Sequence, residues 1–213
     1  MKKICILTDF DGTVTQKDTL YTFFEQYAVE KWKEVEQDWV EGKISSKDCL
    51  IKEFNLVPDL SEKLIDDFLE TIKIDEHFQS FYNYITSKNT DIFIVSDGVD
   101  YFINHILKKH NLDHIKIFSN HGKFIGKQFV LDFPNDNKSC IKDSGTCKCK
   151  VLQNLRTEYS KIIYIGDGVS DFCVADKADY LFAKTKLYKH CTENNIPCTE
   201  YNNFKDIQNS IVF

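Results

Sequence analysis

The sequence predicts an α/β fold with a mostly parallel sheet, interrupted near its start by a block of helices. Short apolar runs alternate with helical stripes over most of the chain, and this alternation favours parallel strands joined by crossover helices. Residues 15–77 break the alternation, because they show helical periodicity with no convincing strand between the helices. We therefore expect a core domain of residues 1–14 and 78–213, with residues 15–77 forming a separate helical cap domain.

Each expected element has its own pattern. Strands are expected within the apolar runs at residues 4–7, 92–95, 161–165 and 179–182, and as short pieces over 115–133. Helices are expected where apolar residues recur three and four positions apart. In the cap these are Leu20, Phe23, Phe24 and Tyr27, then Trp32, Val35 and Trp39, then Leu64, Ile65, Phe68, Leu69 and Ile72; core helices are expected around residues 78–85, 99–107, 148–158 and 169–176, with a final helix–strand tail.

Composition and charge limit the partners that the chain can have. The formal net charge of −6 argues against binding to nucleic acid or to an anionic membrane surface. The apolar run after "MKK" has only the letters "ICIL", which is too short for a secretory signal peptide. We therefore expect a reduced cytoplasmic protein whose eight cysteines are mostly small core residues. Its oligomeric state, monomer or homodimer, is left open.

Polar clusters follow three of the expected strands. Asp9 and Asp11 come after the first strand, Ser96-Asp97-Gly98 ends the second, and Gly166-Asp167-Gly168 with Asp171 follows a later one. Active sites of open α/β sheets lie beyond the carboxyl ends of the strands, so these clusters should converge. Gathered carboxylates need a cation, and oxygen ligands completed by water suit Mg²⁺. Together with hydroxyl, N–H and lysine donors for phosphate oxygens, the set implies phosphoryl transfer.

The same residues resemble the four motifs of the haloacid dehalogenase superfamily. "DFDGTVT", "VSDG", a lysine that opens a helix and "GDGVSD" occur in the right order over most of the chain. The resemblance implies a Rossmann-like core, with Asp9 as nucleophile and Asp11 as general acid and base. It also implies Mg²⁺ held by Asp9, the Asp11 carbonyl and Asp167, with support from Asp171. The position of the cap is similar to that in the phosphoserine phosphatase subgroup.

The resemblance further implies contacts between the chain and its phosphorylated substrate. Lys148 and Lys150 both stand near the start of the relevant helix, and Lys148 has the spacing to the following apolar pair that related sequences show. We therefore expect Lys148 to bind phosphate and offset the charge of Asp9. Asp18 is expected either as a helix N-cap or facing the site, two compatible roles. The expected substrate contacts are Thr13, Asp18, Ser96, Asp97, Gly98 and Lys148.

The substrate is left open among small phosphorylated metabolites. Residues 15–77 contain no arginine to grip a carboxylate, which weakens the phosphoserine interpretation. The stretch "SCIKDSGTCKCK" is more similar to the MtnX-type branch of methionine-salvage phosphatases, which act on 2-hydroxy-3-keto-5-methylthiopentenyl 1-phosphate. Asp97 is closer to the phosphocholine, phosphoethanolamine and pyridoxal phosphate phosphatases of the same superfamily.

Several alternatives stand beside this interpretation. Asp9 and Asp11 could belong to a solvated turn or to a receiver domain, and the whole chain could be a phosphotransferase or a silent phospholigand-binding module. Cys140, Cys147 and Cys149 are either loop thiols or part of a zinc site with a further ligand. The stripe of Trp32 and Trp39 is expected to belong to the core of the cap, although either ring could touch the substrate.

Overall fold

The computed structural model describes residues 3–139 and 143–211. They form a seven-stranded sheet in the order β4-β3-β2-β1-β5-β6-β7, in which only β3 and β4 pair antiparallel among the described strands. The strand β1 lies between β2 and β5, so the polar residues that follow these three strands meet at one edge. The strands are β1 (Lys3–Thr8), β2 (Asp91–Val99), β3 (Ile117–Ile125), β4 (Gln128–Asp132), β5 (Tyr159–Gly166), β6 (Tyr180–Ala183) and β7 (Thr199–Glu200).

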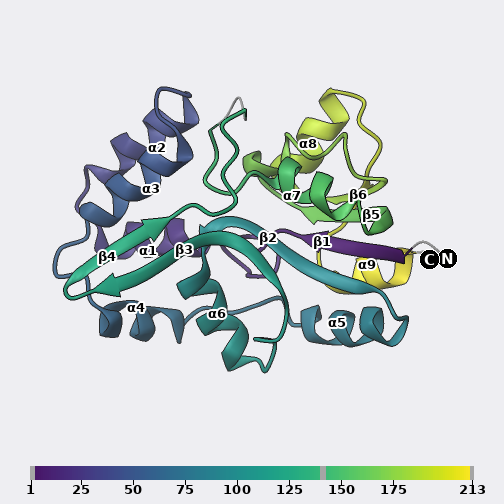
Figure 1. The fold of residues 1–213 in the computed structure, drawn as a ribbon, viewed down its shortest axis with the longest axis horizontal. Helices are drawn as coiled ribbons and strands as arrows, with labels where there is room; N and C mark the ends of the chain where they lie inside the picture. The colour runs from purple at the N-terminus through teal and green to yellow at the C-terminus, as the bar shows by residue number, and fades with distance from the viewer. Residues whose placement is uncertain (1–2, 140–142, 212–213) are drawn as a thin grey trace.

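Helices cover both faces of this sheet. On one face lie α5 (Phe78–Ser87), α6 (Asp100–Lys109) and α9 (Phe204–Ser210), and on the other lie α7 (Lys148–Leu155) and α8 (Thr185–Glu193) (Figure 1). Alternate residues of β1 serve the two layers, because Ile6 packs in the cluster beneath α5 and α6 while Cys5 and Leu7 pack under α7 and α8. Burial on both faces explains why β1 is continuously apolar.

Between β1 and α5 the chain forms four helices, which we call the helical insertion. They are α1 (Thr19–Tyr27), α2 (Trp32–Val40), α3 (Ser46–Asn55) and α4 (Glu62–Leu69). Asp18, Ser45 and Ser61 cap α1, α3 and α4 by accepting hydrogen bonds from backbone N–H groups. Phe23 and Phe54 make edge-on ring contacts with Phe102 of α6, so the insertion shares one hydrophobic cluster with the core. The division of domains at residues 15 and 77 stays a prediction.

The second strand ends close to where it was expected, because β2 includes Ser96-Asp97-Gly98 and runs to Val99. One local expectation from the sequence was wrong. The helix expected over 169–176 is a single 3₁₀ turn, Val169–Asp171, followed by turns. The Asp171 carboxylate accepts hydrogen bonds from the N–H groups of Asp167 and Gly168, and this local bonding replaces a regular helix start.

The upper side of the molecule is divided into two groups of helices. The helices α2 and α3 stand on one side and α7 and α8 on the other, and residues 133–139 and 143–147, which follow β4 and precede α7, lie between them (Figure 1). The described helices include none with the length and apolarity that a bilayer span requires. The residues at the carboxyl ends of β1, β2 and β5 face the space between these two groups of helices.

Candidate active site

Asp9 and Lys148 form a buried ion pair at the end of β1. Asp9 directly follows the strand and is 4% exposed, while Lys148 is the first residue of α7 and 2% exposed. The Lys148 Nζ lies 2.8 Å from Asp9 Oδ1, 2.7 Å from Asp171 Oδ1 and 2.9 Å from Ser170 Oγ. Lys150 is exposed, and its Nζ donates to the Asp136 carbonyl. The structure thus places Lys148, and not Lys150, beside Asp9.

Burial and neighbouring charges shift the pKa values of both Asp9 and Lys148. Burial raises the pKa of Asp9 well above its usual range, the Asp171 carboxylate raises it further, and Lys148 lowers it. Burial alone would lower the pKa of Lys148, but the carboxylates of Asp171 and Asp9 raise it above its ordinary value. Lys148 is therefore a permanent cation between two buried acids.

Asp171 uses both of its carboxylate oxygens within the protein. Its Oδ1 accepts from Lys148 Nζ and, at 2.5 Å, from the hydroxyl of Tyr164. Its Oδ2 accepts from the N–H groups of Asp167 at 2.9 Å and Gly168 at 3.0 Å. A carboxylate has about four lone-pair sites. Since these four bonds fill them, Asp171 is suited to positioning Lys148 and the loop after β5 rather than to direct metal coordination.

Asp167 completes an acidic group that could hold a metal. One carboxylate oxygen each from Asp9, Asp167 and Asp171 lies within 4.8 Å of the others. Asp167 is oriented by the Thr13 hydroxyl, which donates to its Oδ1 at 3.0 Å. Gly12 passes so close that a Cβ there would lie 2.8 Å from Asp167 Oδ2, and its φ of +72° also favours glycine. The carboxylates of Asp9, Asp167 and Asp171 outnumber the ammonium groups of Lys148 and Lys184 that act on them, so this oxygen donor set fits a hard divalent cation.

Asp11 is held by hydrogen bonds to residues other than Asp9 and Lys148. Its Oδ1 accepts from the Thr19 N–H at 2.9 Å, and its Oδ2 accepts from the Ser96 hydroxyl at 3.4 Å. Burial raises the pKa of Asp11, although the hydrogen bonds from Thr19 lower it. A Cβ at Gly98 would lie 2.7 Å from Asp11 Oδ2, so only glycine allows this approach of β2. The Gly98 N–H donates to Ser96 Oγ at 2.9 Å.

Asp97 joins three separate parts of the chain. Its Oδ1 accepts from the Thr146 N–H at 2.8 Å and from Asn120 Nδ2 at 3.2 Å. The Ser46 side chain of α3 also hydrogen-bonds to it and lowers its pKa, although burial raises the pKa overall. Asp97 therefore fixes the segment before Lys148 against β2, and connects both to the helical insertion.

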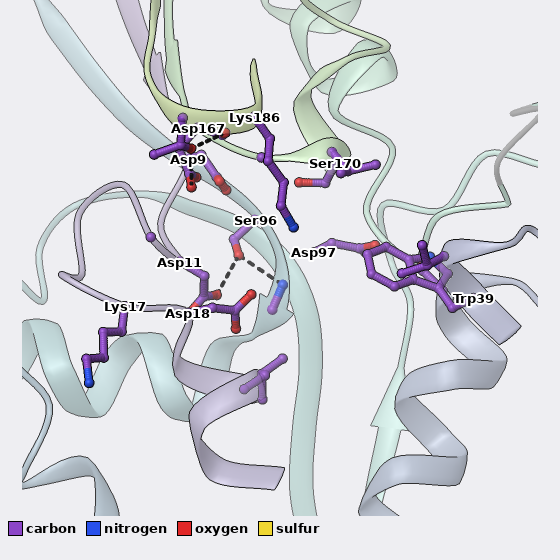
Figure 2. A pocket seen from close by; sticks show the side chains of 18 of the residues that line it. Asp9, Asp11, Lys17, Asp18, Trp39, Ser96, Asp97, Asp167, Ser170 and Lys186 are labelled. Atoms are coloured by element: carbon purple, nitrogen blue, oxygen red, sulfur yellow. Dashed lines mark hydrogen bonds between the residues drawn. The ribbon is translucent and has the colours of Figure 1, made fainter. Parts of the chain in front are cut away.

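A cavity of about 920 Å³ lies above these residues. Asp9, Asp11, Ser96 and Asp167 face it from the core, Lys186 enters from α8, and Trp39 stands on the side of the insertion (Figure 2). Such a volume suits a small metabolite. Among the predicted substrate contacts, Asp18, Ser96, Asp97 and Gly98 line this cavity, whereas Thr13 and Lys148 lie behind its wall.

Asp18 combines the two roles that the sequence allowed. It caps α1 by accepting from the Tyr21 N–H at 2.9 Å, and it also lines the cavity. Partial desolvation between the surrounding elements, followed by the Asp11 charge, raises the pKa of Asp18 to about 7. Trp32 is buried, as expected for a core residue, whereas Trp39 is half-buried and reaches the cavity.

Sequence reasoning missed several residues around the site. Tyr164, Ser170 and Thr146 were hidden because their partners are distant in sequence, and nothing local marks them. The insertion also contributes Glu36, Cys49 and Glu53 to the cavity wall. Burial, followed by the neighbouring Glu36, raises the pKa of Glu53 to about 9. Spacing could have suggested only that Cys49 and Glu53 share one face of a helix.

The cysteine cluster expected near the lysine is only partly visible. Cys140 lies outside the described residues. The Cys149 thiol donates to the Cys173 carbonyl at 2.7 Å, and Asn137 Nδ2 lies 3.7 Å from the Cys147 sulfur. The groups of three or more potential metal ligands found among residues 3–139 and 143–211 include neither Cys147 nor Cys149. A zinc site here gains no support from the described part of the chain.

Comparison with known proteins identifies the family. The family model described as "Putative Phosphatase" matches residues 4–198. The chain belongs to this family of phosphatases. A curated relative from Geobacillus thermodenitrificans is 30% identical over 209 residues, which cover 97% of this chain and 94% of the relative. Another from Bacillus velezensis is 30% identical over 97% of this chain and 88% of the relative. Both are named 2-hydroxy-3-keto-5-methylthiopentenyl-1-phosphate phosphatase.

Solved structures show the same fold. A phospho-aspartyl intermediate analogue of phosphoserine phosphatase aligns over 100% of both chains, with a TM-score of 0.75 and 22% identity. A substrate-bound phosphoserine phosphatase gives a TM-score of 0.73 at 22% identity, covering 100% of this chain and 99% of that one. The predicted α/β fold with a mostly parallel sheet is confirmed. The chain is a phosphatase of the family matched above.

Proposed function

We propose that this phosphatase works through a phosphorylated Asp9. The observation that carries the proposal is the buried Asp9 carboxylate, which accepts a hydrogen bond from Lys148 and lines the same cavity as Asp11. An Asp9 oxygen attacks phosphorus, and the bond from phosphorus to the ester oxygen breaks with its electron pair on that oxygen. Asp11 donates a proton to this leaving oxygen.

The second half of the reaction restores both residues. Asp11, now ionised, takes a proton from a water molecule whose oxygen attacks the phosphorus of the phospho-aspartate. The bond from phosphorus to Asp9 breaks, so that inorganic phosphate leaves and Asp9 is again a carboxylate. The raised pKa of Asp11 supports this cycle, because the group must hold a proton before the first step.

Mg²⁺ is the proposed cofactor, and the oxygen donors described above fit it. Asp9, Asp167 and the Asp11 carbonyl would hold the ion, while Asp171 supports them through Lys148 and the loop after β5. Magnesium bound there would neutralise the acidic group, keep Asp9 ionised and polarise the phosphoryl oxygens. Ser96 is the proposed donor to those oxygens, and the Lys148 ammonium beside Asp9 would offset the charge of Asp9 and of the phosphoryl group.

For the substrate we propose 2-hydroxy-3-keto-5-methylthiopentenyl 1-phosphate. The proposal is supported by the relatives named for this activity, which align over nearly the whole chain. The cavity also accepts a metabolite of this size. A cytoplasmic location remains part of the proposal, supported by the burial of Cys5, Cys49 and Cys191 as core residues.

The first experiment tests the chemistry apart from the substrate. Purified protein with Mg²⁺ should release phosphate from p-nitrophenyl phosphate, and Asp9→Asn should abolish this while the thermal unfolding transition remains cooperative. Retained turnover in Asp9→Asn would assign the nucleophile elsewhere. Adding glycerol as an acceptor distinguishes the phosphotransferase alternative, because glycerol phosphate would then form in place of inorganic phosphate.

The second experiment tests the substrate. A panel should compare kcat/KM for the methionine-salvage ester with phosphoserine, phosphocholine, phosphoethanolamine and pyridoxal phosphate. We expect the salvage ester to lead by at least about tenfold. A different leader would replace the substrate and leave the phosphatase chemistry untouched.

A further inference from the structure

The helical insertion contains a second group of ligand-type side chains. Glu36 comes from α2, and Cys49 and Glu53 lie four residues apart on α3, so that both project from the same face. One ligand atom from each of the three lies within 4.8 Å of the others. All three line the cavity, on the wall formed by the insertion and not by the core strands. None of them has a part in the phosphatase mechanism.

Glu53 points to a missing ligand in this group. It is 5% exposed, and its Oε1 has no hydrogen-bond partner among the described residues. Its closest polar neighbours are the Glu36 carboxyl and the Cys49 thiol, an acid and a weak donor. Buried acids are ordinarily paired with a cation or coordinate a metal, because an unpaired buried carboxyl loses its hydration.

The cations of the structure do not fill this role. The positive charge of Lys186 on α8 lowers the pKa of Glu36, which is half-buried. No ion pair within the described ranges includes Glu53. The Cys49 sulfur lies 3.8 Å from the Val35 carbonyl and 3.9 Å from Glu36 Oε2, so the thiol points into the same small space. The three side chains thus converge on one small space in which a buried Glu53 oxygen has no hydrogen-bond partner in the described part of the chain.

We propose that Glu36, Cys49 and Glu53 form a second metal site, for a thiophilic divalent ion such as Zn²⁺. Carboxylate oxygen and cysteine sulfur are both zinc ligands, and three protein ligands leave one position open. A sulfur ligand separates this site from the all-oxygen group at Asp9 and Asp167, which suits Mg²⁺. Binding forms a metal–sulfur bond and releases the Cys49 proton, with the carboxyl proton shared by Glu36 and Glu53, to solvent. The open position faces the cavity.

Cobalt provides a direct measurement of this site, independent of phosphatase activity. Full-length protein saturated with Mg²⁺ is titrated with Co²⁺, and a sulfur-to-cobalt charge-transfer band is recorded in the near ultraviolet. We expect one equivalent to give the band, Cys49→Ser to lose it, and Glu53→Gln to weaken binding by at least about tenfold. Cys149→Ser is the matched control: its thiol is half-buried and bonds to the Cys173 carbonyl, so the band should remain.

Two further measurements test whether the metal is bound by Cys49 and not by the magnesium group. Asp9→Asn should retain the cobalt band, because it alters only the magnesium group. X-ray absorption of the zinc-loaded wild type should show one sulfur at about 2.3 Å among oxygen ligands, and this needs no variant to fold. Absence of sulfur around zinc, or a cobalt band that survives Cys49→Ser, would overturn the site.

Discussion

The ammonium group of Lys148 lies 2.8 Å from the carboxylate of Asp9, and the side chains of both residues are almost fully buried. Asp171 holds the other side of the same ammonium at 2.7 Å. Removing one member of a buried ion pair leaves an uncompensated charge, which is more costly than the pair itself. The geometry therefore links stability and catalysis at one side chain.

Replacing Lys148 should damage the enzyme far more than replacing Lys150. Lys148→Met keeps much of the side-chain volume but removes the charge, and we expect kcat to fall by about 10²–10³, as for loss of a positioned donor. Lys150→Ala should stay close to wild type, since Lys150 is exposed and its ammonium donates to the Asp136 carbonyl rather than to Asp9. Steady-state hydrolysis of p-nitrophenyl phosphate measures both. Equal losses, or the reverse order, would move the phosphate-binding role to Lys150.

Asp11→Asn should act according to the leaving group. Asparagine preserves an acceptor for the Thr19 N–H but cannot donate a proton as an acid does. We expect a loss of about 10²–10⁴ for alkyl phosphates, whose leaving oxygen needs a proton, and a much smaller loss for p-nitrophenyl phosphate. Comparing kcat for both substrates measures the difference. A similar loss for both would argue against the acid role.

Tyr164→Phe tests the support behind Lys148. The lost hydroxyl bond to Asp171 should cost about 1.5–3 kcal/mol, because its acceptor is charged and buried. A looser Asp171 should also lower kcat more than it changes KM, since Lys148 acts on the reacting phosphoryl group. Tyr159→Phe is the control: it lies on the same strand and loses a 2.6 Å bond to Asp91, at the end of the strand away from the site. Thermal unfolding should therefore show that both variants are destabilised, whereas steady-state kinetics should show a lower kcat for Tyr164→Phe alone.

Asp18 should make stability depend on pH. Its pKa is raised from 3.8 to about 7 in the folded chain, so the unfolded chain releases this proton first as pH rises. The stability contributed by this group therefore falls between about pH 4 and pH 7 and stays low above that range. Asp18→Asn keeps a good N-cap and cannot ionise.

Thermal unfolding of the metal-free proteins checks this expectation. Asp18→Asn should be more stable than the wild type where Asp18 would be ionised in the unfolded chain. Because Asp18 is exposed to the cavity, screening limits this gain in the free energy of unfolding to about 1 kcal/mol or less, or about 2–4 °C in Tm. The gain should appear above pH 7 and disappear as the pH falls toward 4. A gain of the same size at every pH would contradict the assigned charge effect.

The parts predicted well from the sequence are those with local signals. The apolar runs before Asp9 and Asp167 indicated strands, and their polar ends converge because β1 lies between β2 and β5. The prediction of a helix over 169–176 was wrong because the Asp171 side chain accepts hydrogen bonds from two preceding backbone N–H groups, and this local bonding outweighs the helical pattern. α3 was not singled out, and with it the role of Ser46, Cys49 and Glu53 was missed.

The sequence by itself determined the fold class, the family and the residues available for phosphoryl transfer, because apolar periodicity and short motifs are local properties. Only the tertiary structure decided that Lys148 bonds Asp171 as well as Asp9, that Asp171 is fully bonded within the protein, and that Glu36 joins Cys49 and Glu53. These contacts join residues far apart in the chain or on different helices. They depend on the order of the strands and on how the insertion packs against α6, which no local pattern specifies.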